Sequence, residues 1–208
     1  KTEAPQGPYR MQGLADDIKA LLDKLELGRV HFAGISLGGM LGQVLALAYP
    51  QSLKSLILCD TTCRVPPEMG PAWQERIDMA RQHGMQPLVE PTLDRWLTPE
   101  FREKNPKTVE RIAQMLGDTP VEGFAGCCQA ISDFDVSERL HAVELPTRIL
   151  VGENDPGTPV QESEAIQQRI PGAQLEVLPE ARHLSCVEAA ERFNHSLKEF
   201  LAGVEQVG

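Results

Sequence analysis

A serine flanked by glycines is the residue of this chain best placed for chemistry. Ser36 stands in Gly34-Ile35-Ser36-Leu37-Gly38, which follows the apolar run at 30–33 and precedes a helix-like stretch at 39–49. A strand, a sharp turn and a helix in this order expose a serine hydroxyl at the carboxyl edge of a sheet, and the glycines remove Cβ atoms that would collide there. The pattern predicts a nucleophilic serine. The alternative is a glycine-rich turn whose serine only caps the helix.

A nucleophilic serine needs a base, and His183 is the histidine whose position suits that role. It follows the apolar run at 174–178, on a loop before the last helical pattern. The other four histidines lie inside a strand, in or beside a helical segment, or within the last helix: His31, His83, His141 and His195. We therefore predict His183 as the general base, against the alternative of a solvated loop residue.

The base in turn needs an orienting acid, which should lie on the loop after the preceding strand. That loop is Gly152-Glu153-Asn154-Asp155-Pro156, and we predict Asp155 as the acid. Asp60 ends an earlier strand at the same sheet edge and is the alternative, whereas Glu153 fits a solvated position. The resulting order of serine, aspartate and histidine along the chain is the order found in α/β hydrolases.

The elements that must position these residues alternate between strands and helices. Short apolar runs typical of strands buried on both faces occur at 55–60, 147–151 and 174–178, in addition to the run before Ser36. Leu14, Ile18, Leu21, Leu22 and Leu25 recur at helical spacing, with Gly28 where a C-terminal cap belongs. Thr158-Pro159-Val160-Gln161 has the cap residue, proline and glutamine of a helix start. The alternation predicts an α/β fold, with a mostly parallel sheet covered by helices on both faces.

The alternation is interrupted by a proline-rich helical segment between about Arg64 and Leu145. Eight prolines and several helical apolar patterns fill it, such as Val109, Ile112, Ala113 and Leu116. We predict a helical cap insertion at 64–145. It divides the core into a first part at 1–63, which carries the serine turn, and a second part at 146–208, which carries the acid and the base.

Composition limits the classes of partner. The 208 residues carry a formal net charge of −10, and no basic stripe is visible. This argues against nucleic acid and anionic membranes as partners, because both attract clustered cations. The five cysteines are odd in number and form no C-x-x-C pair, which disfavours a disulfide framework and a zinc site. We expect reduced thiols, no metal, no cofactor and a cytoplasmic protein.

Several segments together resemble the α/β hydrolases, close to the 3-oxoadipate enol-lactonase branch and related carboxylesterases. The resemblance runs nearly end to end and is strongest at 34–40, 93–98, 123–131, Gly152-Glu153-Asn154-Asp155 and His183-Leu184-Ser185. It implies an α/β-hydrolase fold and serine-driven hydrolysis of a small-molecule ester or lactone, without metal or cofactor. Related caps also serve carboxylesterases, other lactonases and perhydrolases. A non-catalytic ligand receptor on the same scaffold is the alternative from another class.

The resemblance also indicates residues that contact the substrate. Trp96, Phe124 and Trp73 are candidate walls of the binding site, and Arg95 or Arg102 are candidates to bind a substrate carboxylate. The alternative for the arginines is a solvated helix face.

The front of the chain departs from the family pattern. In the family, the first strands and a His-Gly loop that donates one oxyanion N–H precede a segment like residues 1–9. We therefore expect further strands, from a separate N-terminal segment or a partner chain, to complete the sheet beside the strand at Val30. The backbone N–H of Leu37 is the one oxyanion donor that we identify within the sequence.

Overall fold

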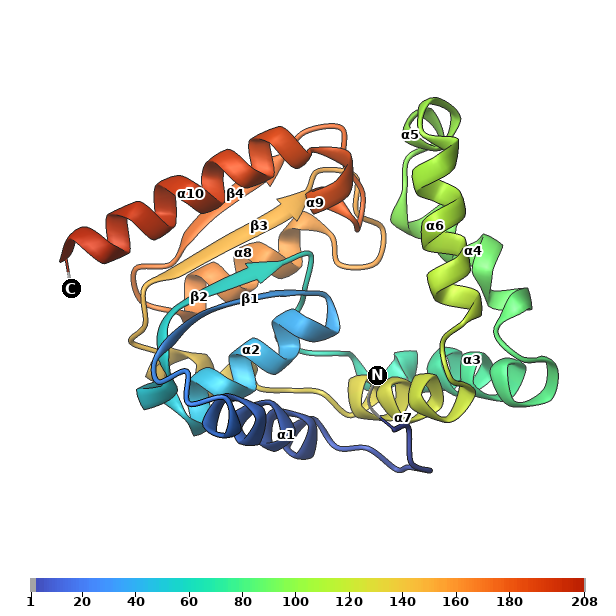
Figure 1. The fold of residues 1–208 in the computed structure, drawn as a ribbon, viewed down its shortest axis with the longest axis horizontal. Helices are drawn as coiled ribbons and strands as arrows, with labels where there is room; N and C mark the ends of the chain where they lie inside the picture. The colour runs from blue at the N-terminus through green and yellow to red at the C-terminus, as the bar shows by residue number, and fades with distance from the viewer. Residues whose placement is uncertain (1–2, 208) are drawn as a thin grey trace.

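Within residues 3–207, four parallel strands form a sheet. The computed structural model describes residues 3–207 (Figure 1). The strands are β1 (Val30–Ile35), β2 (Leu53–Cys59), β3 (Thr147–Gly152) and β4 (Gln174–Leu178), in the spatial order β1-β2-β3-β4. All three neighbouring pairs are parallel, with Ile35 opposite Cys59 and Cys59 opposite Leu150. The carboxyl ends of the strands therefore meet at one edge, as the sequence predicted.

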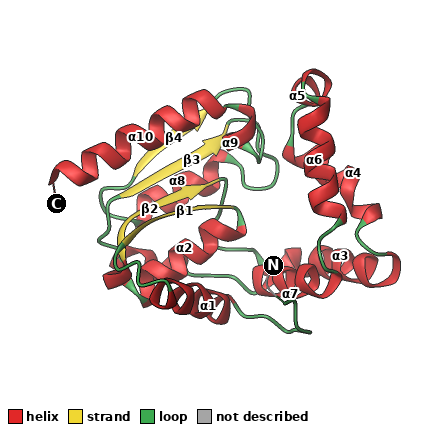
Figure 2. Ribbon diagram, viewed as in Figure 1, coloured by secondary structure: helices red, strands yellow, loops and turns green. Residues whose placement is uncertain are grey.

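Helices cover both faces of the sheet (Figure 2). Alternate residues of β2 and β3 point to opposite faces. On one face, Leu56, Leu58 and Ile149 are buried in a cluster with Leu45 of α2 (Leu37–Ala48) and Ile166 of α8 (Val160–Arg169). On the other face, Ile57, Cys59 and Leu150 pack with Phe193, Leu197 and Phe200 of α10 (Ala190–Val207). Each fully buried Leu or Ile stabilises the fold by roughly 1.5–3 kcal/mol, so these two clusters hold the layers together.

Within residues 3–207 the sheet has two open edges, the outer edges of β1 and β4. β1 pairs with β2 on one side, and its side chains are half-buried except for the exposed Ala33. All but one of the β2 residues, by contrast, are buried. A further strand beside β1, from another segment or a partner chain, stays a prediction.

A helical insertion follows β2 and returns the chain to β3. It contains α3 (Gly70–His83), α4 (Gln86–Trp96), α5 (Pro99–Lys104), α6 (Pro106–Gly117) and α7 (Val121–Ser132), between the short 3₁₀ helices η2 (Pro67–Met69) and η3 (Ser137–Ala142). The amide of Val65 donates to Phe134 O at 2.8 Å, and the amide of Val136 donates to Cys63 O at 2.9 Å. These bonds join the two segments of chain through which the insertion connects to the core. Its helices stand beyond the carboxyl edge of the sheet (Figure 1).

Two local expectations differ from the structure. The first helix, α1 (Met11–Lys24), ends with Leu25 as its C-cap, so Gly28, with φ +61°, lies in the loop before β1 and does not cap the helix. Helix α8 begins after Thr158, but the Thr158 hydroxyl donates to Asp155 Oδ2 at 2.6 Å and does not cap the helix. The helix starts one residue later than the pattern predicted, with Pro159 at the N-cap position, and the Thr158 hydroxyl bonds to the buried carboxylate.

Candidate active site

Ser36 occupies a strained turn between β1 and α2. Its φ of 53° and ψ of −116° lie in a region that a non-glycine residue rarely adopts. The turn is held by the Ser36 amide, which donates to Cys59 O at 2.9 Å, and by the Thr61 hydroxyl, which donates to Ser36 O at 2.8 Å. A Cβ at Gly34 would lie 2.2 Å from Gly38 O, so the turn requires glycine there. The Ser36 side chain makes no capping bond to α2, which disfavours the capping alternative.

The backbone N–H of Leu37, the predicted oxyanion donor, begins α2. The first N–H groups of a helix have no partner within the helix, and the helix dipole gives this end a partial positive charge. The position therefore suits an N–H that stabilises a developing oxyanion beside Ser36.

His183 and Asp155 form a buried hydrogen-bonded pair. His183 Nδ1 lies 2.7 Å from Asp155 Oδ2, and the two residues are 6% and 3% exposed. The carboxylate also accepts from the Gly157 amide at 2.8 Å, the Thr158 amide at 3.1 Å and the Thr158 hydroxyl. An ionised carboxylate only accepts hydrogen bonds, so Nδ1 carries the proton and Nε2 is left as an acceptor.

The surroundings of Asp155 keep it ionised. Burial alone raises the pKa of this carboxyl, but the bonds from His183, Thr158 and Gly157 outweigh burial and hold the pKa below its ordinary value. The acid therefore stays negative at neutral pH and stabilises a positive charge on the His183 ring.

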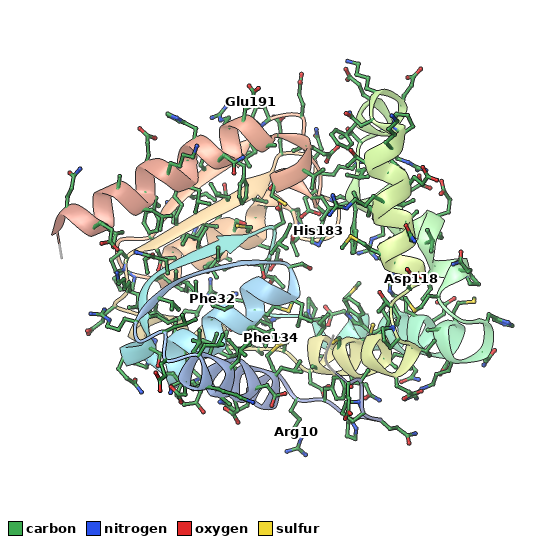
Figure 3. The ribbon with its side chains drawn as sticks, in the orientation of Figure 1. Arg10, Phe32, Asp118, Phe134, His183 and Glu191 are labelled. Atoms are coloured by element: carbon green, nitrogen blue, oxygen red, sulfur yellow. The ribbon has the colours of Figure 1, made fainter. Side chains whose placement is uncertain are left out.

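Close backbone packing brings together the loops that carry Asp155 and His183. The amides of Glu153 and Asn154 donate to Leu178 O and Ala181 O, each at 2.9 Å. A Cβ at Gly152 would lie 2.2 Å from Arg182 O, so only glycine permits this approach. His183 lies at the carboxyl edge of the sheet, on the side of the helical insertion (Figure 3). Within residues 3–207, no hydrogen bond joins the Ser36 hydroxyl to His183.

Asp60, the alternative acid, has a different set of partners. It is fully buried at the carboxyl end of β2 and accepts from the Gly152 amide at 2.8 Å and from the Ser185 hydroxyl at 2.5 Å. It thus links the end of β3 to the short helix α9 (Ser185–Glu188), which follows His183. Burial raises its pKa to about 7, although the bonds from Ser185 and Gly152 oppose this shift. The ring of His183 donates to Asp155 and not to Asp60.

Replacement of Asp60 by asparagine should change how stability depends on pH. Between about pH 4 and pH 7 the folded protein holds a proton on Asp60 that the unfolded chain has released, so this group lowers the free energy of unfolding as pH rises through that range. In D60N this decline should be missing. The free energy of unfolding of D60N minus that of wild type should therefore be larger at pH 8 than at pH 5, by up to a few kcal/mol. Urea unfolding at both pH values measures it. If the free energy of unfolding depends on pH equally in the two proteins, the pKa of Asp60 is not raised.

The helical insertion supplies two of the predicted contacts beside His183. The Trp96 ring lies 6.1 Å from the His183 ring, and the Leu184 amide donates to Trp96 O at 3.1 Å. A Cβ at Gly157 would lie 3.4 Å from Arg95 Nη2 and 3.7 Å from His183 Nδ1. Arg95 therefore reaches the loop that holds the acid.

The other candidate contacts lie elsewhere in the insertion. Trp73 and Phe124 pack with Ile77, Ala125 and Cys128 where α3 meets α7. Arg102 is engaged by Glu90 and Asp94 of α4, which leaves it paired within the insertion.

Sequence reasoning missed Glu188, which ties the insertion to the His183 loop. Its Oε1 accepts from the Thr98 amide at 2.7 Å and the Thr98 hydroxyl at 2.6 Å, and its Oε2 accepts from the Arg182 amide at 2.6 Å. The Arg182 side chain also donates to Leu97 O. No local pattern marks these residues, because their partners are far away in the sequence.

A large cavity lies away from these residues. It has a volume of about 860 Å³ and opens at the amino edge of the sheet, between the strand starts and α10, where Arg29, Lys54, Arg148 and Phe200 line it. None of the predicted site residues borders it, and the strained turn, the buried His183–Asp155 pair and the converging loops locate the candidate site at the opposite edge.

Within the described residues, no group of three or more His, Cys, Asp or Glu side chains is arranged to hold a metal ion. Helices long and apolar enough to cross a bilayer are likewise not found in this part of the chain.

Comparison with known proteins agrees with this geometry. Residues 1–190 match the family model described as the alpha/beta hydrolase fold. The chain belongs to the α/β hydrolase family. It is 36% identical to 3-oxoadipate enol-lactonase 2 of Acinetobacter baylyi over 95% of this chain and 73% of that protein. The resemblance expected from the sequence is thereby confirmed.

Solved α/β hydrolase structures superpose closely on this one. The enol-lactonase from Burkholderia xenovorans has a TM-score of 0.92 and 32% identity, covering 96% of this chain and 76% of its own. A thermophilic esterase from Thermogutta terrifontis also has a TM-score of 0.92 and 32% identity, with 97% and 75% covered. The fold class predicted from the sequence is confirmed.

Proposed function

We propose that this chain is a serine hydrolase that cleaves a carboxylic ester or lactone through an acyl-enzyme. The buried bond of 2.7 Å between His183 and Asp155 is the observation that carries the proposal, because it fixes the histidine tautomer that a general base needs. Ser36 on its strained turn and the relatives described as enol-lactonases support it.

The proposed reaction has two steps. Ser36 Oγ attacks the carbonyl carbon while His183 Nε2 takes the hydroxyl proton, and the Leu37 N–H stabilises the oxyanion. When the tetrahedral intermediate collapses, the bond to the leaving oxygen breaks and His183 returns its proton to that oxygen. Water, deprotonated by His183, then attacks the acyl carbon. The bond from this carbon to Ser36 Oγ breaks as His183 returns the proton to Oγ, which releases the acid and restores Ser36. With a lactone, the leaving oxygen stays tethered to the acyl group.

The partner in this proposal is a small-molecule ester or lactone, and no metal takes part. An enol-lactone is the substrate class favoured by the named relatives, and simple carboxylic esters are the second choice because an esterase is equally similar in structure.

Partitioning of the acyl group between water and methanol tests this proposal. We expect turnover of 4-nitrophenyl, phenyl and ethyl esters of one acid, insensitive to excess EDTA, with one ratio of methyl ester to free acid for all three. A common acyl-enzyme gives a common ratio because the leaving group has departed before partitioning. A ratio that changes with the leaving group would contradict the acyl-enzyme. No turnover would instead favour a ligand receptor.

A further inference from the structure

The backbone on both sides of His183 is held by hydrogen bonds to other elements. The amide of Arg182, the residue before it, donates to Glu188 Oε2 on α9 at 2.6 Å. The amide of Leu184, the residue after it, donates at 3.1 Å to Trp96 O, at the end of α4 in the helical insertion. Both neighbours of the base are therefore fixed by partners outside its own loop.

Glu188 joins this loop to the helical insertion with a single side chain. Its Oε2 accepts from the Arg182 amide, and its Oε1 accepts from the amide and the hydroxyl of Thr98 at 2.7 Å and 2.6 Å. All three partners are donors, which suits a carboxylate because both of its oxygens accept. Hydrogen bonds to a carboxylate are shorter and stronger than those between neutral groups. The Glu188 carboxylate thus spans the residue before the base and the junction of α4 with α5.

Both ends of this bridge are themselves fixed. The helix that carries Glu188 is held at its start by the Ser185 hydroxyl, which donates to Asp60 Oδ2 at 2.5 Å. At the other end, Thr98 is the N-cap of α5, and its hydroxyl accepts from the Phe101 amide at 3.2 Å. Neither end of the bridge shifts without breaking a further bond.

The place of the His183 ring depends on this support. Residues 179–184 form neither helix nor strand, so no regular backbone ladder holds them. The ring must nevertheless keep Nδ1 at 2.7 Å from Asp155 Oδ2. A general base acts only within hydrogen-bond reach of the proton that it takes. A displacement of about 1 Å is enough to slow such a step by about 100-fold.

We propose that Glu188 is a positioning residue for His183: by joining the Arg182 amide to Thr98, it makes the place of the base depend on the docked helical insertion. The inference rests on the proposed function, in which His183 is the base. The insertion then contributes in two ways, through the Trp96 ring that lies 6.1 Å from the His183 ring and through the Glu188 bridge.

Two substitutions of Glu188 test this role. Glu188→Ala removes all three acceptor bonds, so kcat for a 4-nitrophenyl ester should fall about 10- to 100-fold while KM changes less than about threefold, because a misplaced base slows the chemical step and not binding. Glu188→Gln keeps one oxygen that accepts from the Arg182 amide, so its kcat should fall only about 2- to 5-fold. The matched control is Glu191→Ala, an exposed carboxylate at the start of α10 (Figure 3), which should leave kcat unchanged.

The proton on His183 Nδ1 gives a second readout that needs no turnover. In protein made with isotope-labelled histidine, the nuclear magnetic resonance signal of this proton is identified by its loss in His183→Ala, and it reports the bond to Asp155. In Glu188→Ala the signal should shift and exchange faster with water, and in Glu191→Ala it should stay unchanged. A role in stability alone would lower the free energy of unfolding but leave the signal of the folded protein in place.

The outcomes separate this inference from the proposed function. If wild type hydrolyses the ester and Glu188→Ala keeps kcat within about threefold, the function stands and the positioning role is wrong. A higher KM at unchanged kcat, or an equal loss in Glu191→Ala, would also overturn the role. If wild type hydrolyses no ester, the proposed function fails, and an unchanged Nδ1 signal in Glu188→Ala then overturns the positioning role separately. Should Glu188→Ala not fold, unchanged kcat and an unchanged signal in Glu188→Gln overturn it.

Discussion

Ser36→Ala is expected to lower kcat for ester hydrolysis by about 10⁴- to 10⁶-fold. Loss of a nucleophile removes the covalent pathway, which costs far more than loss of a binding contact. Alanine keeps a Cβ and adopts the same backbone, so the bonds of Cys59 O and Thr61 to the turn persist and the variant should unfold at the same urea concentration as wild type. Initial rates with a 4-nitrophenyl ester measure the loss.

A second serine provides the control for this substitution. Ser163 on α8 is fully buried, and its hydroxyl has no hydrogen-bond partner among the described residues. Ser163→Ala should therefore keep full activity, because removal of an unpartnered hydroxyl breaks no bond. Activity retained in Ser36→Ala would remove Ser36 from the mechanism.

Asp155→Asn is expected to lower kcat by about 10³- to 10⁴-fold, because it reverses the tautomer of the base. An asparagine whose amide nitrogen faces Nδ1 donates a hydrogen bond there and leaves the proton on Nε2. His183 then has no free lone pair to accept the serine proton. The loss should appear in kcat, with little change in substrate binding, since the side chain is nearly isosteric.

Thr158→Val is the matched control for the acid. It removes one hydroxyl donor at 2.6 Å from Asp155 Oδ2 but keeps the bond to His183 and both backbone donors. The pKa of Asp155 should rise modestly and activity should fall less than about tenfold. Equal losses in Asp155→Asn and Thr158→Val would mean that the loop is merely disordered by either change.

The strands, and the candidate site residues that follow them, could be predicted from the sequence because both depend on local patterns. β2 and β3 contain short apolar runs, Leu56–Cys59 and Ile149–Val151, that are buried on both faces, and the residues directly after parallel strands meet at one edge. This is why Asp155 and His183 could be paired from their positions alone.

What the sequence left open depends on contacts between distant segments. Glu188 bonds to Thr98, ninety residues away, and Asp60 bonds to Gly152 and Ser185. Thr158 matched a capping pattern, and only the position of Asp155 shows why its hydroxyl turns elsewhere.

In the proposed mechanism Ser36 carries the acyl group, and His183 activates the Ser36 hydroxyl. Reaction with a fluorophosphonate, followed by digestion and peptide mass spectrometry, tests this most directly. We expect one adduct, on the peptide that contains Ser36, formed far more slowly in His183→Ala and absent in Ser36→Ala. An adduct on any other residue, or ester turnover by a protein that carries no adduct after the same treatment, would contradict the account.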